Sequence, residues 1–205
     1  MPENIDTIVF DLGNVLIQWD PRHLYRKIFK EEEQITWFLE NICTSEWNDQ
    51  QDAGRSFADG IKELVAKHPE WEEPITAWGT RWQETINGPI HGSVEILRSL
   101  RDSKKYRLYA LTNWSAETFP WALDNFDFLH WFEGIVVSGH EKTRKPFPEF
   151  FNILFNRYKV EPAKTIFIDD NLKNVKGSND VGMNTIHFQS PEQLKTALTQ
   201  YGVQV

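Results

Sequence analysis

The chain has 205 residues, of which 40% are hydrophobic and 25% charged, and this is enough apolar content for one folded domain or one domain with an insertion. Its formal net charge of −8 argues against a general nucleic-acid binder, and its single cysteine, Cys43, excludes an internal disulfide and a cysteine-rich zinc site. The N-terminal residues are polar and no apolar run approaches the ~18 residues of a membrane span, so we expect a cytoplasmic protein that does not enter a membrane.

The first predicted element is a buried strand that ends in an acid. The apolar run from Ile8 to Phe10 is followed by Asp11 and then by a Gly13-Asn14 loop. Ligands of open α/β sheets bind at the carboxyl ends of strands, so Asp11 is a candidate site residue. A residue that only caps the turn is an equally good interpretation of this stretch alone.

Residues 18–88 show helical periodicity, and we expect no strand between Gln18 and Asn87. The predicted helices begin near Pro21 and then cover Glu32–Asn41, Phe57–Lys67 and Trp71–Ile86. Besides Trp19 at its start, this segment holds five of the nine tryptophans, at positions 37, 47, 71, 78 and 82. Packing between helices is favoured over a substrate role for them.

From Gly92 onward the pattern alternates between helix and strand. The predicted strands are Arg107–Leu111, Gly134–Ser138, Thr165–Ile168 and Asn184–Phe188. Such alternation predicts an α/β fold with a doubly wound parallel sheet. With Asn87-Gly88-Pro89 as the breaker, we expect a core of residues 1–17 and 89–205 and a helical insertion of residues 18–88.

Polar side chains stand at the ends of three of these strands. They are Asp11, the pair Thr112-Asn113 and the pair Asp169-Asp170, with Lys145 in a turn before a helix. In a parallel sheet these groups converge on one edge. Three close carboxylates repel one another, and a hard divalent cation relieves that repulsion. Together with the lysine and the two donors of Thr112-Asn113, the set would suit a bound phosphate.

Four motifs in order make the chain resemble the haloacid dehalogenase (HAD) superfamily. They are Phe10-Asp11-Leu12-Gly13-Asn14-Val15-Leu16, Leu111-Thr112-Asn113, Lys145-Pro146 and Ile168-Asp169-Asp170-Asn171. Each motif is weak alone, but four in order at strand ends are specific, and the match spans essentially the whole core. The helical insertion after the first motif resembles the family's C1-type cap, and the Leu-Gly-Asn-Val sequence resembles a phosphatase-like subgroup.

The resemblance implies a hydrolase that forms an aspartyl-phosphate. Asp11 would be the nucleophile, and water would then hydrolyse the intermediate. Thr112 and Asn113 would bind phosphoryl oxygens, and Lys145 would neutralise the charge that develops there. The expected partner is a small phosphorylated molecule, and the protein would be a monomer or a dimer.

The resemblance also implies a magnesium cofactor. Mg²⁺ would bind the Asp11 carboxylate, the Gly13 backbone carbonyl and Asp170, with Asp169 acting directly or through water. Among the residues near these motifs, Asn14 and Asn174 are expected to serve the loop or the helix surface at least as readily as the site.

The chain departs from the family pattern at Gly13. Most phosphatase members carry there a second Asp that acts as general acid and base, and such catalysis is typically worth about 10²–10⁴-fold. A glycine cannot protonate a leaving group. We therefore expect phosphatase activity to favour sugar 1-phosphates, acyl phosphates or similarly activated esters.

Two other functions remain open at this point. A 2-haloacid dehalogenase uses the same nucleophile without metal, but it carries neutral residues in place of Asp169-Asp170, whose charge disfavours a carboxylate substrate. A catalytically weak binding or regulatory protein is supported by Gly13 alone. Substrate choice is expected to lie in the cap, with Arg22, Arg55 and Trp47 as candidates, and Trp114 is expected to border the pocket or to pack beneath the cap.

Overall fold

The computed structural model describes residues 5–205, and its centre is a five-stranded parallel sheet. The strand order is β5-β4-β1-β6-β7. The strands are β1 (Thr7–Phe10), β4 (Arg107–Thr112), β5 (Gly134–Val137), β6 (Thr165–Asp169) and β7 (Asn184–His187). All four pairings are parallel. The expected doubly wound α/β fold is therefore confirmed, with each strand within a residue or two of its prediction.

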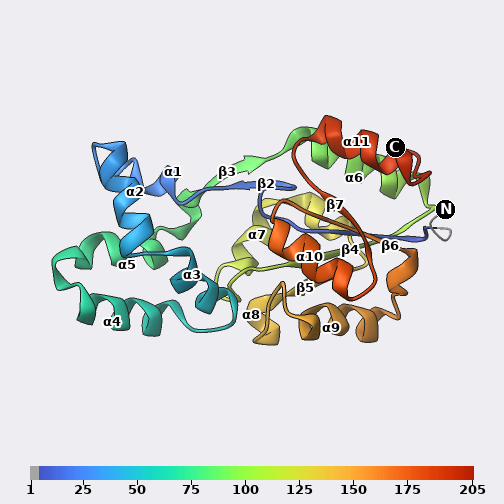
Figure 1. The fold of residues 1–205 in the computed structure, drawn as a ribbon. Helices are drawn as coiled ribbons and strands as arrows, with labels where there is room; N and C mark the ends of the chain where they lie inside the picture. The colour runs from blue at the N-terminus through green and yellow to red at the C-terminus, as the bar shows by residue number, and fades with distance from the viewer. Residues whose placement is uncertain (1–4) are drawn as a thin grey trace.

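Helices cover both faces of this sheet (Figure 1). On one side lie α6 (His91–Ser103), α7 (Phe119–Asn125) and α11 (Pro191–Gln200), and on the other α8 (Ser138–Glu141), α9 (Pro148–Tyr158) and α10 (Leu172–Asp180). Successive residues of a strand point to opposite faces, so Ile8 and Phe10 pack into one apolar cluster and Val9 into the other. Short 3-10 turns at Asp127–Trp131 and Pro162–Lys164 complete the connections.

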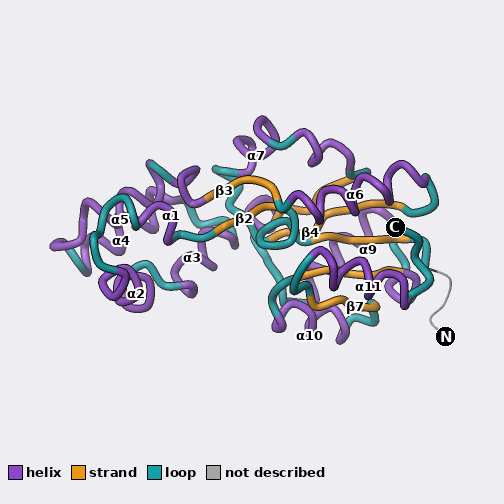
Figure 2. The backbone as a smooth tube through the Cα atoms, turned by 90° about the horizontal axis from the view of Figure 1, so that it is seen from above, coloured by secondary structure: helices purple, strands orange, loops and turns teal. Residues whose placement is uncertain are grey.

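The helical insertion stands beyond one end of the sheet, and the C-terminus lies at the far end (Figure 2). It contains α1 (Arg22–Tyr25), α2 (Glu32–Asn41), α3 (Ser45–Asp52), α4 (Phe57–Lys67), α5 (Glu72–Thr80) and two 3-10 turns, Pro69–Trp71 and Trp82–Thr85. The bounds of α2 and α4 are those predicted. The insertion is joined to the sheet by an antiparallel ribbon of β2 (Ile17–Trp19) and β3 (Ile86–Pro89).

Three features of this segment differ from the expectations. One is the predicted helix Trp71–Ile86, which is instead α5 followed by a 3-10 turn, with Ile86 in β3. The absence of strands is contradicted by β2 and β3, which are too short to show alternation, and β3 contains the Asn87-Gly88-Pro89 breaker. The helix α3 was not predicted because its sequence, Ser-Glu-Trp-Asn-Asp-Gln-Gln-Asp, carries only one apolar residue. Helical periodicity cannot be detected without an apolar stripe.

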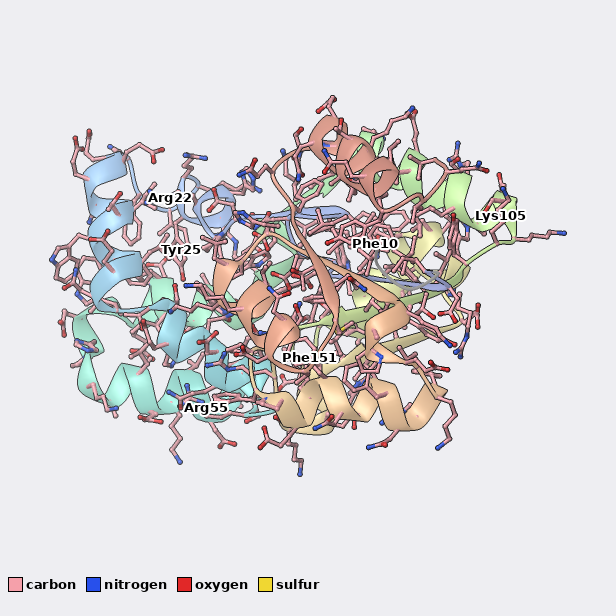
Figure 3. All side chains as sticks on the ribbon, turned by 45° about the vertical axis from the view of Figure 1, so that its right-hand side comes forward. Phe10, Arg22, Tyr25, Arg55, Lys105 and Phe151 are labelled. Carbon is pink, nitrogen blue, oxygen red and sulfur yellow. The ribbon has the colours of Figure 1, made fainter. Side chains whose placement is uncertain are left out.

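Aromatic side chains fill the interior of the insertion. The rings of Tyr25 and Phe38 lie 4.8 Å apart between centroids, and the Tyr25 hydroxyl donates to the Pro74 carbonyl over 3.0 Å. Figure 3 places Tyr25 in this half of the molecule and Phe10 and Phe151 in the sheet half. No helix within residues 5–205 is both long and apolar enough to cross a membrane.

Replacing Leu100 tests the packing of α6 against the sheet. Leu100 is fully buried, and Leu100→Ala is expected to lower the free energy of unfolding by about 2–5 kcal/mol because the cavity fills only in part. Urea denaturation measures the loss. The same substitution at Leu172, which is 54% exposed, is the control and should change stability by less than about 0.5 kcal/mol. Equal losses in both variants would contradict this packing.

Candidate active site

The polar residues predicted at strand ends lie at one edge of the sheet, next to the insertion. Asp11 follows β1, Thr112 ends β4 and Asp169 ends β6, and β1 lies between the other two strands. The Asp11 backbone N–H donates to the Ile168 carbonyl over 2.8 Å, which continues the ladder between β1 and β6. The backbone pairing therefore sets the spacing of Asp11 and Asp169.

Lys145 lies buried between two of these acids. Its ammonium Nζ is 2.8 Å from Asp11 Oδ1 and 2.7 Å from Asp169 Oδ2, and the side chain is fully shielded from solvent. Burial alone lowers the pKa of Lys145, but the two carboxylates outweigh it and raise that pKa above its ordinary value. The two carboxylates therefore favour the charged form of Lys145 at this site.

Asn113 holds the Lys145 backbone in place. Its Nδ2 donates to the Lys145 carbonyl over 3.1 Å, and its Oδ1 accepts from the Lys145 N–H over 2.9 Å. These two bonds use the amide oxygen and one amide hydrogen of Asn113. Asn113 also lines the pocket described below, so its second amide hydrogen can be donated to a ligand.

Asp169 has both carboxylate oxygens occupied by protein donors. Besides Lys145, it accepts from the Asn171 backbone N–H over 2.8 Å and from Asn174 Nδ2 over 3.1 Å to each oxygen. It is fully buried and is not part of the pocket lining. Sequence reasoning assigned Asn174 no firm role, and the only available signal was its place one helical turn after the acid pair.

The three acids form a compact group of hard oxygen ligands. One carboxylate oxygen each from Asp11, Asp169 and Asp170 lies within 4.8 Å of the others. Burial raises the pKa of Asp11, as do its two acidic neighbours, while Lys145 lowers it. Burial and then Asp169 raise the pKa of Asp170. A single lysine leaves this group under-compensated, so the donor set fits a small divalent cation.

Thr112 carries a hydroxyl that has no partner. Its Oγ1 is buried and makes no hydrogen bond within the described residues 5–205. A buried hydroxyl without a partner is costly, and such groups frequently await a ligand. Its place at the end of β4, beside Asn113, fits the predicted contact with a phosphoryl oxygen.

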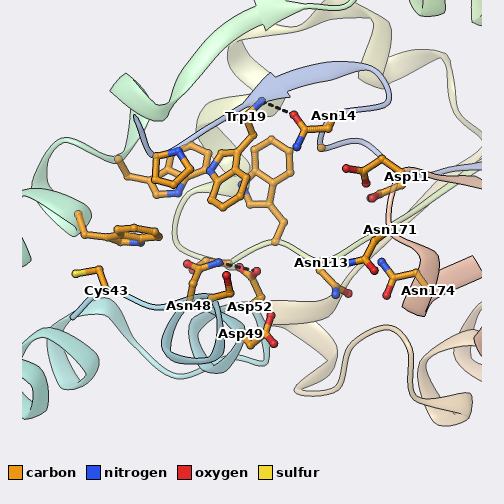
Figure 4. Close-up of a pocket in the computed structure, with 18 of the residues that line it drawn as sticks. Asp11, Asn14, Trp19, Cys43, Asn48, Asp49, Asp52, Asn113, Asn171 and Asn174 are labelled. Carbon is orange, nitrogen blue, oxygen red and sulfur yellow. Dashed lines mark hydrogen bonds between the residues drawn. The ribbon is translucent and has the colours of Figure 1, made fainter. Parts of the chain in front are cut away.

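A cavity of about 280 Å³ lies between this sheet edge and the insertion (Figure 4). Asp11, Gly13, Asn113 and Asp170 line it on the sheet side. The insertion and the segment after β4 supply four indoles, from Trp19, Trp78, Trp82 and Trp114. Trp78 and Trp82 are at the same time packed in the core, so packing and pocket-lining roles coincide for these two residues. Trp114 borders the pocket, which was one of its two expected places.

The helix α3 supplies the remaining polar wall. Its pocket-lining residues are Ser45, Asn48, Asp49 and Asp52. By contrast, the expected specificity candidates are not among the lining residues of the described chain: Arg22 bonds Thr36, Arg55 bonds Glu63, and Trp47 donates to the Gly60 carbonyl. Figure 3 shows both arginines on the helical half.

Comparison with known proteins gives one family. Residues 5–182 match the family model described as haloacid dehalogenase-like hydrolase. A sesquiterpene phosphatase from Aspergillus oryzae is 27% identical over 180 residues, 88% of each chain. A D-ribitol-5-phosphate phosphatase from Bacteroides thetaiotaomicron is 21% identical over 206 residues, 95% of this chain and 97% of that protein.

Solved structures agree with this match. A HAD family enzyme from Bacteroides thetaiotaomicron superposes with a TM-score of 0.70 at 26% identity, covering 96% of this chain and 99% of that one. Its complex with magnesium and inorganic phosphate superposes with a TM-score of 0.69 at 23% identity, covering 91% and 96%. A dehalogenase reaches 0.72 at 15% identity, covering 97% and 99%, so the fold alone does not choose between the two reactions.

Removing the buried ammonium tests the electrostatics of the site. In chelator, Lys145→Met should lower the free energy of unfolding by about 3–5 kcal/mol, because two buried carboxylates lose their counter-charge. The pKa of Asp11, already raised, rises further, so the folded variant binds protons that the unfolded chain releases. The deficit should therefore grow as pH rises above about 8, where Asp11 of the parent ionises while Asp11 of the variant stays protonated.

Urea denaturation at several pH values measures this deficit. The control is Lys176→Met, at an exposed position of α10, which should leave stability nearly unchanged at every pH. A Lys145→Met protein as stable as the parent at the alkaline end would contradict the pairing.

Proposed function

The chain belongs to the haloacid dehalogenase-like hydrolases, and we propose that it is a magnesium-dependent phosphatase acting on a small phosphorylated metabolite. The observation that carries this proposal is the buried Lys145, paired with Asp169 and with Asp11, which lines the cavity together with Asp170. A cation and an acid pair at that place suit a phosphoryl group held by a metal. The phosphatases among the relatives support the same reaction.

Asp11 would attack phosphorus through Oδ2. Its Oδ1 accepts from Lys145 Nζ over 2.8 Å and from the Leu12 N–H over 2.7 Å, and Oδ2 has no hydrogen-bond partner in the described chain. Attack forms the bond from Oδ2 to phosphorus and releases the alcohol oxygen with its electron pair. Water then attacks the aspartyl-phosphate, releases inorganic phosphate and restores the carboxylate.

The residues that would hold Mg²⁺ are Asp11, Asp170 and the carbonyl of Gly13, all of which line the cavity. When bound, the ion would supply charge that draws the phosphoryl oxygens to Asp11 and favours its ionised form. Asp169 was expected to join the ion directly or through water. Its four hydrogen bonds favour a positioning role instead, in which it holds Lys145.

The remaining predicted residues would bind the phosphoryl oxygens. The unpartnered Thr112 hydroxyl and the spare amide hydrogen of Asn113 are the neutral donors. Lys145 would neutralise the charge that grows in the transition state. Because these groups are already fixed, they would not need to reorganise during the reaction.

The leaving group would be one that departs without a proton from the enzyme. Gly13 offers no acid, which supports sugar 1-phosphates, acyl phosphates and similar esters. A cavity of about 280 Å³ limits the substrate to a small metabolite. Residues 18–88 would act as the cap that closes over it. The cytoplasmic location and the monomeric or dimeric state remain predictions.

The role of Asp11 is tested with Asp11→Asn and Asp11→Ala. Both should lower turnover of an activated aryl phosphate by at least about 10³-fold, because the nucleophile is lost. Chelation of Mg²⁺ should abolish turnover in the parent protein, and added Mg²⁺ should restore it. Steady-state release of inorganic phosphate measures both effects, with circular dichroism to show that the variants fold. Chloride release from a 2-haloacid in chelator, without phosphatase activity, would instead establish a dehalogenase.

The role of Gly13 is tested by supplying the acid. No described atom lies within 4 Å of a Cβ built at Gly13, so Gly13→Asp has room for its side chain. We expect it to raise turnover of a simple alkyl phosphate by about 10²–10⁴-fold and to change turnover of an aryl phosphate little.

Gly13→Ala, which adds the Cβ without the carboxyl, is the matched control and should raise neither rate. Equal rates for both esters in the parent protein would contradict the leaving-group argument. Failure of Gly13→Asp to improve the alkyl ester would contradict it as well.

A further inference from the structure

The helix α3 presents one polar face to the cavity. Ser45, Asn48, Asp49 and Asp52 recur at i, i+3, i+4 and i+7, which places them on one side of the helix. The other side is fixed inside the insertion, where Trp47 donates to the Gly60 carbonyl over 3.3 Å and Gln51 donates to the Trp47 carbonyl over 2.7 Å. The polar face is therefore held in position by the packing behind it.

The two acids on this face differ in their partners. Asp49 Oδ2 lies 2.8 Å from Arg144, whose guanidinium also donates to the Lys145 carbonyl, so Asp49 ties α3 to the loop that carries Lys145. Asp52 Oδ2 accepts from Asn48 over 3.0 Å, but its Oδ1 accepts from nothing in the described residues, and Asp52 forms no ion pair there. Asp49 thus serves the structure, and Asp52 keeps a free acceptor.

The surroundings of Asp52 make an unpaired carboxylate oxygen energetically unfavourable there. Asp52 is only partly exposed, and burial raises its pKa to about 7, with Asp49 adding to the shift and Arg144, Asn48 and Lys145 opposing it. A carboxylate held in a pocket without its full set of hydrogen bonds gains from any donor that a ligand brings.

The opposite wall of the cavity is formed mainly by the faces of indole rings. Figure 4 shows indole rings, Trp19 among them, facing the residues of α3 across the pocket. The rings of Trp82 and Trp114 lie 5.5 Å apart between centroids, at 52°. A ligand that fits both walls has an apolar face for the indoles and donors along its other edge. A hydrocarbon chain satisfies only the indoles, and it would strip water from Asp52 without replacing it.

We propose that Asp52 is a specificity residue that accepts a hydrogen bond from a hydroxyl of the leaving group, so that the substrate is a polyhydroxylated phosphate monoester. The phosphate binds at Asp11, the carbon-bound hydrogens of the substrate contact the indoles, and its hydroxyls face Ser45, Asn48 and Asp52. This inference rests on the proposed phosphatase function and adds the substrate class.

The test compares two esters that differ only in their hydroxyls. Ribitol 5-phosphate and n-pentyl phosphate share five carbons and a primary, unactivated leaving oxygen, and the small inductive advantage of the polyol is the same in the parent and in the Asp52 variant. We expect the parent protein with Mg²⁺ to favour the polyol by at least about 10-fold in kcat/KM, the value of one hydrogen bond to a charged group. In Asp52→Leu, which keeps the volume but not the acceptor, this ratio should fall by about 10-fold or more.

Further measurements distinguish a failure of this inference from a failure of the proposed phosphatase function. Glu46→Leu removes an exposed acid of the same helix outside the pocket lining and should keep the parent ratio. Calorimetric binding of both esters to the Asp11→Asn protein should show the same preference, and it should be weakened in Asp11→Asn/Asp52→Leu. If Asp52→Leu misfolds, both rates are lost and the ratio of kcat/KM values cannot be measured. Asp52→Asn is then used instead, and it is expected to lose part of the preference.

Three outcomes would overturn the inference. They are a parent ratio near one, an unchanged ratio in a folded Asp52→Leu protein, whether or not both rates fall, and preference for 5-aminopentyl phosphate over the polyol. If p-nitrophenyl phosphate is hydrolysed in each of these cases, the phosphatase function stands and only the substrate class fails. If it is not hydrolysed either, both fail.

Discussion

The contact on which the site depends is the buried ion pair network of Lys145 with Asp11 and Asp169. A lysine with no exposed surface is tolerated only when its charge is matched and its ammonium is hydrogen-bonded, and both conditions are met within 2.8 Å. Each partner is then fixed by something else. Asn113 makes two hydrogen bonds with the Lys145 backbone, and Asn174 and the Asn171 N–H donate to Asp169. The backbone pairing of β1 with β6 fixes the position of Asp11. The charged groups of the sheet edge are therefore held in position by contacts within the protein.

The sheet edge and the insertion line different parts of the cavity. In the proposed reaction the charges of the sheet edge would recognise the phosphoryl group, which every phosphate ester has in common. The indoles and the polar face of α3, which the insertion supplies, would recognise what differs between esters. The pair of Asp49 with Arg144 joins the two parts one residue from Lys145, and the Phe57 N–H donates to Glu117 at a second junction. The helix α3 is thus tied to the loop that carries Lys145.

The sequence predicted what repeats locally and missed what only three-dimensional packing decides. Alternating apolar runs and helical stripes located all five strands of the sheet, and four short motifs located the acids and Lys145. The same method could not find α3, because a helix whose stability comes from Trp47 and Gln51 packing into the insertion has no apolar stripe to detect. Arg22 and Arg55 were considered for their charge, yet their partners, Glu32 and Glu63, lie on neighbouring helices. The difference between Asp169 and Asp170 could not be predicted from the sequence either, since only the fold shows which of two adjacent acids has both carboxylate oxygens hydrogen-bonded within the protein.

Gly13 and Asp52 stand on different sides of one cavity, and they constrain the same molecule in different ways. The space around Gly13 could hold a carboxylate, so packing does not impose the absence of one, and in the proposed reaction this absence would restrict the ester to a leaving group that needs little protonation. The free oxygen of Asp52 would be matched by a hydrogen-bond donor on that leaving group. An acyl phosphate with a plain hydrocarbon chain meets the first condition alone, and a phosphorylated open-chain polyol meets the second alone. A sugar phosphorylated at its anomeric oxygen meets both, because the ring oxygen eases departure of the leaving group while the ring hydroxyls and carbon-bound hydrogens suit the two walls of the pocket.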